Sequence, residues 1–141
     1  MSDAPELERH AWDMVEDAER EVETVSTEAV RDVMDEEGVV LVDIRDVREL
    51  WIEGTIPGAH HAPRGMLEFW ADPETEYYRD YFRPDRRYVI FCNEAGRSAL
   101  AARRMAEMGF ADVAHMAGGF TAWQEAGYPV EAVEQRDYKR E

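Results

Sequence analysis

Cys92 is the single cysteine in a chain of 141 residues, and its neighbours favour a reactive thiol. It follows the apolar run 88–91 and precedes the loop 93–96, which leads to Arg97 and a helical pattern. The N–H groups of such a loop, the start of the helix and the guanidinium would bring positive charge near the sulfur. This charge favours the nucleophilic thiolate and forms a cradle for an anion. The alternative reading of a lone cysteine is a small buried apolar residue.

The segments around Cys92 predict a parallel sheet. The runs 39–44, 88–91 and 113–116 are apolar and rich in β-branched or aromatic residues, as expected of strands buried on both faces. Apolar residues recur with helical spacing across 26–38, 98–108 and 120–126. Asp46 and Glu49 form a capping box for a short helix at 47–51, and a further short helix is expected at 66–71. Alternating strands and helices predict a parallel sheet with helices on both faces. Reactive groups gather at the carboxyl ends of such strands, where Cys92 falls.

The N-terminal segment is expected to be an acidic amphipathic helix. Apolar residues recur on one helix face across 3–23, and Asp3 with Glu6 fits a capping box. Residues 1–37 hold 14 acidic and 3 basic side chains, much of the formal net charge of −16. We therefore divide the chain into this helix (1–25), one domain (26–133) and a tail (134–141). Either the same domain or a second copy must cover the apolar face of the helix, so we expect a monomer or a homodimer.

Composition disfavours several functional classes. The acidic charge argues against nucleic-acid and anionic-membrane partners, which need clustered Lys and Arg. The chain has no run of 18 apolar residues, and its N-terminus is acidic, so we expect a cytoplasmic protein. One cysteine allows no internal disulfide and no Cys-based zinc cluster. His60 and His61 have no partner at ligand spacing, so we expect neither metal nor cofactor.

Four segments, 42–45, 54–59, 92–98 and 118–123, resemble the motifs of single-domain rhodaneses and occur in that family's order. They lie within 39–130, about two-thirds of the chain. The resemblance implies a rhodanese-like three-layer α/β fold with a central parallel sheet of about five strands. It also implies a thiosulfate sulfurtransferase without a cofactor. In this reaction Cys92 takes the outer sulfur of thiosulfate or a related donor as a persulfide and passes it to a small thiophilic acceptor, such as cyanide, or to a protein thiol.

We expect a role for each residue near the sulfur. Catalytic residues would be Cys92 and Arg97; substrate-binding residues Asn93, Glu94, Ala95, Gly96 and Arg64; structural residues Asp43, Arg45 and Ser98. Arg64 is included because a basic side chain in the loop before Met66 could face the pocket and attract an anionic donor. The sequence departs from the family at three positions. Ala95 stands where Gly is frequent, and Thr55 replaces the usual His. Glu94 opposes both a thiolate and an anionic donor unless its carboxylate points outward.

Two other functions remain open from the residues. A rhodanese-like module could bind a partner without catalysis, or relay persulfide from a protein donor only, and Glu94 encourages this view. Phosphatases and arsenate reductases of the same fold place Arg six residues after Cys, which forms a loop wide enough for a tetrahedral oxyanion. Here Arg97 follows Cys92 by five residues, and the tighter loop favours a sulfane sulfur.

Overall fold

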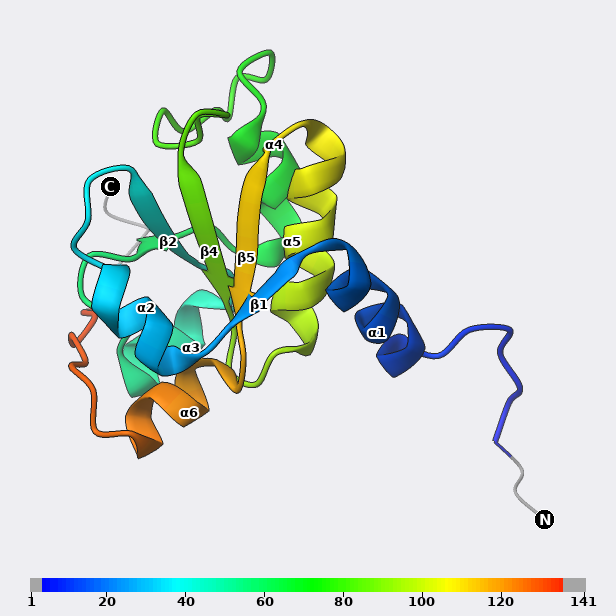
Figure 1. Cartoon of the computed structure of the whole chain (residues 1–141), viewed down its shortest axis with the longest axis horizontal. Helices are drawn as coiled ribbons and strands as arrows, with labels where there is room; N and C mark the ends of the chain where they lie inside the picture. Colours follow the sequence, from blue (N-terminus) through cyan, green and yellow to red (C-terminus); the bar gives the residue numbers. More distant parts are fainter. Residues whose placement is uncertain (1–3, 136–141) are drawn as a thin grey trace.

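A five-stranded parallel sheet forms the centre of the computed structural model, which describes residues 4–135. Its strands are β1 (Glu23–Val25), β2 (Val39–Asp43), β3 (His60–His61), β4 (Arg87–Phe91) and β5 (Asp112–Met116). They lie in the order β1-β5-β4-β2-β3, with β4 in the middle (Figure 1). This arrangement confirms the predicted α/β fold.

Helices cover both faces of the sheet. They are α1 (Ala11–Glu21), α2 (Thr27–Val33), α3 (Val47–Glu53), the short 3-10 helix η1 (Arg64–Met66), α4 (Leu67–Ala71), α5 (Gly96–Met108) and α6 (Gly119–Glu125). Figure 1 shows α1, α4 and α5 on one side of the sheet and α2, α3 and α6 on the other. Within residues 4–135, every helix is too short or too polar to span a membrane.

Side chains alternate between two cores because successive residues of a strand point to opposite faces. On β4, Ile90 belongs to the core beneath α5, together with Met105. The next residue, Phe91, belongs to the opposite core with Trp123 of α6. Trp123 is fully buried. Both faces of β4 are therefore apolar, and its carboxyl end is fixed between two packed layers.

The N-terminal helix is shorter than the sequence predicted. It begins at Ala11, where the backbone N–H of His10 donates to the Asp13 carboxylate at 3.3 Å. The helix prediction is wrong for residues 4–10, and the Asp3 side of the proposed capping box lies outside the described residues. The physical reason is packing: Val15 is buried with Ala99 of α5, whereas Leu7 is 63% exposed and would gain no burial from helix formation.

The sequence was less informative about the edge strands, the connection before β4 and the C-terminal tail. β1 and β3 were not found in the sequence, because three-residue and two-residue edge strands carry no readable periodicity. Residues 72–86 connect α4 to β4 and contain turns and bends without a helix. Most of the proposed C-terminal tail, residues 136–141, lies outside the described residues.

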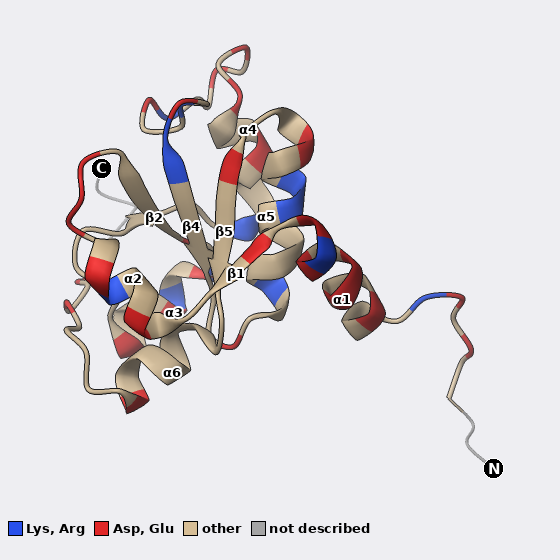
Figure 2. Ribbon diagram, in the orientation of Figure 1, with Lys and Arg blue, Asp and Glu red and all other residues tan. Residues whose placement is uncertain are grey.

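Charge is distributed unevenly between α1 and α5 (Figure 2). Acidic side chains line much of α1, whereas α5 carries arginines. Arg103 of α5 lies 2.9 Å from the carboxylate of Glu21 at the end of α1. The structure thus places the acidic helix on its own domain, through both the apolar contact and this ion pair.

Candidate active site

Cys92 immediately follows β4, at the carboxyl edge of the sheet. The neighbouring strand β2 ends at Asp43, which is the register partner of Phe91. After Cys92 the chain turns through residues 93–95 and enters α5 at Gly96. Cys92, Asp43 and Arg45 therefore meet at one edge, as expected for parallel strands.

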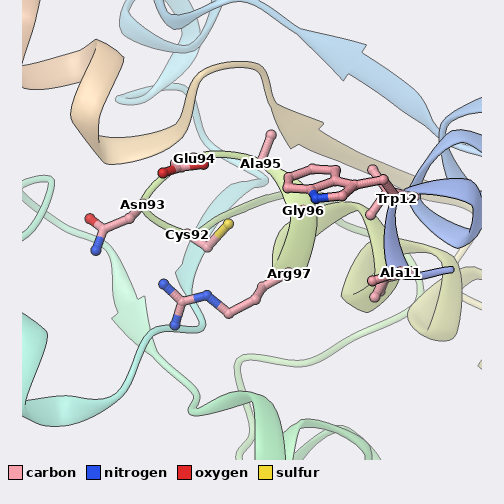
Figure 3. Close-up of a pocket in the computed structure, with 10 residues that line it drawn as sticks. Ala11, Trp12, Cys92, Asn93, Glu94, Ala95, Gly96 and Arg97 are labelled. Atoms are coloured by element: carbon pink, nitrogen blue, oxygen red, sulfur yellow. The ribbon is translucent and has the colours of Figure 1, made fainter. Parts of the chain in front are cut away.

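Cys92 lies at the bottom of a pocket of about 470 Å³. The remaining lining residues come from the loop and from two helices: Ala11, Trp12, Val15, Asn93, Glu94, Ala95, Gly96, Arg97 and Leu100. The sulfur points into the curve of the loop (Figure 3). Only 1% of the surface of Cys92 is exposed, so the residue is buried in the core but still borders the pocket. A small reagent can approach it only from the pocket side.

The loop above the sulfur offers backbone donors. Within residues 4–135, the N–H groups of residues 94–97 donate to no protein acceptor. This follows from their place in the chain, because the first N–H groups of a helix lack intrahelical partners. α5, whose dipole adds partial positive charge at this end, begins at Gly96. The loop can thus accept negative charge that develops near Cys92.

The start of α6 holds the backbone of Cys92 and Asn93, where the chain enters the loop. The Phe120 N–H donates to the Cys92 carbonyl at 2.8 Å, and the Thr121 N–H donates to the Asn93 carbonyl at 3.0 Å. Gly119 has a φ of +59°, and a Cβ there would lie 2.5 Å from the Cys92 carbonyl oxygen. Only glycine allows this approach. The segment 118–123 therefore positions Cys92 through its backbone.

A buried ion pair supports the loop from β2. Arg45 and Asp43 are both fully buried, with Arg45 Nη2 2.8 Å from Asp43 Oδ2. Arg45 also donates to Asn93 Oδ1 at 3.2 Å and to the Gly54 carbonyl at 2.7 Å. The Thr55 hydroxyl donates to Asp43 at 2.8 Å, so this residue joins the network. These contacts fit the structural role expected of Asp43 and Arg45.

Glu49 of α3 is a site residue that the sequence indicated only as a helix cap. Its carboxylate accepts two hydrogen bonds from Arg97, each 3.0 Å, and one from Asn93 Nδ2 at 2.6 Å. The Arg97 guanidinium holds the pKa of Glu49 below its usual range. The sequence signal was limited because a capping box predicts a contact inside α3 and not one to a distant loop.

A model of the rhodanese-like domain family matches residues 26–126, which include the loop, both supporting networks and all of β2 to β5. The chain belongs to this family. The match confirms the resemblance noted in the sequence.

Named relatives of this rhodanese-like domain include sulfurtransferases. Thiosulfate sulfurtransferase GlpE of Pseudoalteromonas translucida is 33% identical over 102 residues, 72% of this chain and 89% of the relative. The polysulfide-sulfur transferase homodimer of Wolinella succinogenes is 26% identical, with a TM-score of 0.70 and 89% of each chain covered. A Rhodopseudomonas palustris protein of unknown function, described as a possible tyrosine phosphatase, is 41% identical, with a TM-score of 0.84 and coverage of 92% and 100%. Similarity to the two transferases supports a sulfurtransferase activity for this chain.

Ser98 lies beneath the loop of the rhodanese-like domain, in contact with a buried histidine. Its hydroxyl donates to the Ala95 carbonyl at 3.0 Å and lies 3.3 Å from His115 Nδ1. The other ring nitrogen of His115 lies 3.1 Å from Glu19 of α1. Burial lowers the pKa of His115, although the Glu19 carboxylate acts in the opposite direction. The imidazole of His115 therefore links the loop, β5 and α1.

Of the predicted substrate-binding residues of this rhodanese-like domain, Arg64 lies away from the Cys92 pocket and Glu94 lines it. Arg64 does not line the Cys92 pocket; its guanidinium lies 2.8 Å from Glu68 and borders a neighbouring pocket. Glu94 lines the Cys92 pocket and is exposed at its rim. Substrate binding by either residue stays a prediction. Within residues 4–135, no three His, Cys, Asp or Glu side chains are grouped as a metal site would require.

Proposed function

We propose that this chain is a sulfurtransferase that carries sulfane sulfur as a persulfide on Cys92, taken from thiosulfate or a related donor. The observation that supports this proposal most directly is the position of Cys92. Its sulfur lies at the bottom of a pocket, inside a loop whose N–H groups at 94–97 have no other acceptor among the described residues. Relatives named as sulfurtransferases add independent support.

In the first half of the reaction, the Cys92 thiolate attacks the outer sulfur of thiosulfate. A new S–S bond forms, the S–S bond of the donor breaks, and its electron pair leaves with sulfite. Because the persulfide remains anionic, the site carries the same charge before and after this step. Loop N–H groups that stabilise a thiolate can therefore also stabilise the persulfide.

In the second half, the acceptor attacks the outer sulfur of the persulfide, and Cys92 leaves as a thiolate. Cyanide would give thiocyanate, and a thiol would give a new persulfide. The chain has no second cysteine that could displace this sulfur as an internal disulfide. Transfer to an external small-molecule or protein acceptor is thus the reaction that completes the cycle.

Intact-protein mass spectrometry tests the first half directly. Incubation with thiosulfate should add about 32 Da, the mass of one sulfur atom, and cyanide should remove it. The Cys92→Ser variant should show no addition. Absence of an adduct after incubation with thiosulfate, polysulfide and glutathione persulfide in turn would contradict the proposal.

Phosphate-ester hydrolysis is the second candidate, because one relative is described as a possible tyrosine phosphatase. Arg97 follows Cys92 by only five residues, and its guanidinium is paired with Glu49. Both features disfavour an oxyanion held by that arginine. We therefore expect no Cys92-dependent hydrolysis of p-nitrophenyl phosphate and no reduction of arsenate. Turnover of either compound that is lost in Cys92→Ser would favour a phosphatase or an arsenate reductase over a sulfurtransferase.

A relay that accepts persulfide from a protein donor only is the third candidate, and Glu94 is its main support. The exposed carboxylate adds negative charge at the pocket rim, which repels small anionic donors. We expect Glu94→Gln to increase the rate with thiosulfate about threefold at low salt, and less at high salt. An unchanged rate would remove this argument for the relay.

A further inference from the structure

One wall of the Cys92 pocket comes from a segment outside the family match. The match covers residues 26–126, whereas Ala11, Trp12 and Val15 belong to α1. Trp12 is 64% exposed although it is the largest side chain on this helix. This exposed ring lines the same pocket as Cys92.

Trp12 has a defined place against the active-site loop. Its indole lies over Gly96, where an added Cβ would come within 3.2 Å of the ring (Figure 3). The helix that carries it is fixed, because Val15 is buried with Ala99 and Arg103 pairs with Glu21. The indole therefore forms one fixed side of the pocket, and Leu100 of α5 continues that side.

Away from the loop, the pocket offers little positive charge to an anionic donor. Among the described residues that line it, only Glu94 and Arg97 are charged. Arg97 is held by both oxygens of Glu49, which balances its charge, and Glu94 is negative. The loop curves around the sulfur at one end of the pocket (Figure 3). Farther from Cys92, the wall formed by α1 and Leu100 can therefore gain binding energy mainly from apolar contact.

We propose that Trp12, with Val15 and Leu100, selects sulfur donors that carry an apolar organic group next to the reacting sulfur. This inference rests on the proposed sulfurtransferase function and specifies its substrate class. A volume of about 470 Å³ lies within the range of about 300–1,000 Å³ that is typical of sites for organic ligands. A small inorganic ion would leave the Trp12 wall without a contact.

An organic thiosulfonate anion represents this class and reacts by a balanced step. The Cys92 thiolate attacks the outer sulfur and forms a new S–S bond. The bond between that sulfur and the sulfonyl sulfur breaks, and its electron pair leaves with the sulfinate. The products are a persulfide and a sulfinate, so no further oxidant or reductant is required.

Two thiosulfonates that differ only in the organic group isolate the apolar contact. Benzenethiosulfonate and methanethiosulfonate carry the same charge and the same reacting atoms. The rate of persulfide formation with each is measured by intact mass, and their ratio is divided by the ratio found for a simple thiol in solution. We expect this normalised preference for the phenyl compound to be about tenfold in the unmodified protein.

Three variants assign the preference to the indole. Trp12→Ala should reduce it to near one, and Trp12→Phe should keep most of it because a phenyl ring preserves an aromatic wall. Met14→Ala is the matched control: Met14 is on the same helix and 38% exposed, but it borders the neighbouring pocket. The control should keep the full preference.

The remaining outcomes overturn either the inference alone or the inference together with the proposed function. An unchanged preference in Trp12→Ala would overturn the inference alone, since persulfide chemistry would continue. An equal loss in Met14→Ala would also overturn it, because the effect would then come from displacement of α1. Absence of persulfide with both reagents in the unmodified protein would overturn the proposed function together with the inference.

Discussion

The carboxylate of Glu49 accepts a hydrogen bond from each terminal nitrogen of Arg97, both 3.0 Å long. Arg97 is the only cationic side chain among the described residues that line the Cys92 pocket. Its ion pair with Glu49 holds the guanidinium against α3. The same carboxylate accepts a hydrogen bond from the Asn93 side-chain amide. Glu49 thus ties both ends of the loop to one helix.

Glu49→Gln should lower the free energy of unfolding by about 1 kcal/mol at neutral pH. The variant keeps the shape of the side chain but removes the charge that Arg97 faces. The expected loss is modest because Arg97 is 45% exposed and its charge is partly screened by solvent. Urea unfolding measures it. Glu125→Gln, an exposed position on α6, is the control and should have no measurable effect.

The pH dependence of that loss follows from the lowered pKa of Glu49. A carboxyl whose pKa is lower in the folded state contributes stability above its unfolded pKa, and the contribution disappears as pH falls through the folded value. The difference between the unmodified protein and Glu49→Gln should therefore shrink as the pH falls from 7 to about 3. A difference that grows on acidification would contradict the assignment of the ion pair.

Arg45→Met should destabilise the fold by about 3–5 kcal/mol, because it leaves the Asp43 carboxylate buried without its partner. Adding Asp43→Asn should recover part of the loss, since the remaining group is then neutral. Denaturant unfolding of both single variants and the double variant completes the cycle. A cost below about 1 kcal/mol for Arg45→Met would show that the pair is not the support described here.

Gly119→Ala should be far more harmful than Gly127→Ala. Both positions have positive φ, at +59° and +74°, so each substitution carries the left-handed penalty of about 1 kcal/mol. Only at Gly119 would the new Cβ also meet the backbone of Cys92 and Asn93, whereas nothing lies within 4 Å at Gly127. Thermal unfolding and the rate of persulfide formation should therefore change strongly for Gly119→Ala. Equal effects of the two substitutions would refute the proposed contact.

His115 should make the fold sensitive to mild acid. Its pKa is lowered in the folded state, so the unfolded chain binds a proton more readily as pH falls below about 6.5. Stability should therefore decrease between pH 7 and pH 5. In His115→Gln this decrease should be smaller, although the overall stability is lower because Ser98 and Thr24 lose an imidazole partner. Urea unfolding at several pH values provides the measurement.

The sequence was sufficient for the centre of the fold because its signals there are local. The apolar run at 39–44 corresponds to β2, and the run before Cys92 corresponds to β4. Strand, loop and helix in succession were enough to place the sulfur at the carboxyl edge. The capping box at Asp46 and Glu49 was also correct, with both of its hydrogen bonds present.

The sequence was insufficient where a residue acts across the fold. Glu49 reaches Arg97 only because the adjacent strands β2 and β4 end together and bring α3 and the start of α5 to the same edge of the sheet. Trp12 reaches the loop only because α1 docks on α5, and helical periodicity does not say which surface a helix will cover. Arg64 shows the converse: its place before α4 suggested the Cys92 pocket, but its guanidinium pairs with Glu68.

The origin of the pocket wall in α1 bears on protein engineering. Trp12 lies ahead of residues 26–126, which match the family model, whereas Cys92 and the segments that hold it lie within them. Substitutions confined to one short helix can therefore alter the surface that a reagent meets, while the strand and loop that carry the sulfur stay unchanged.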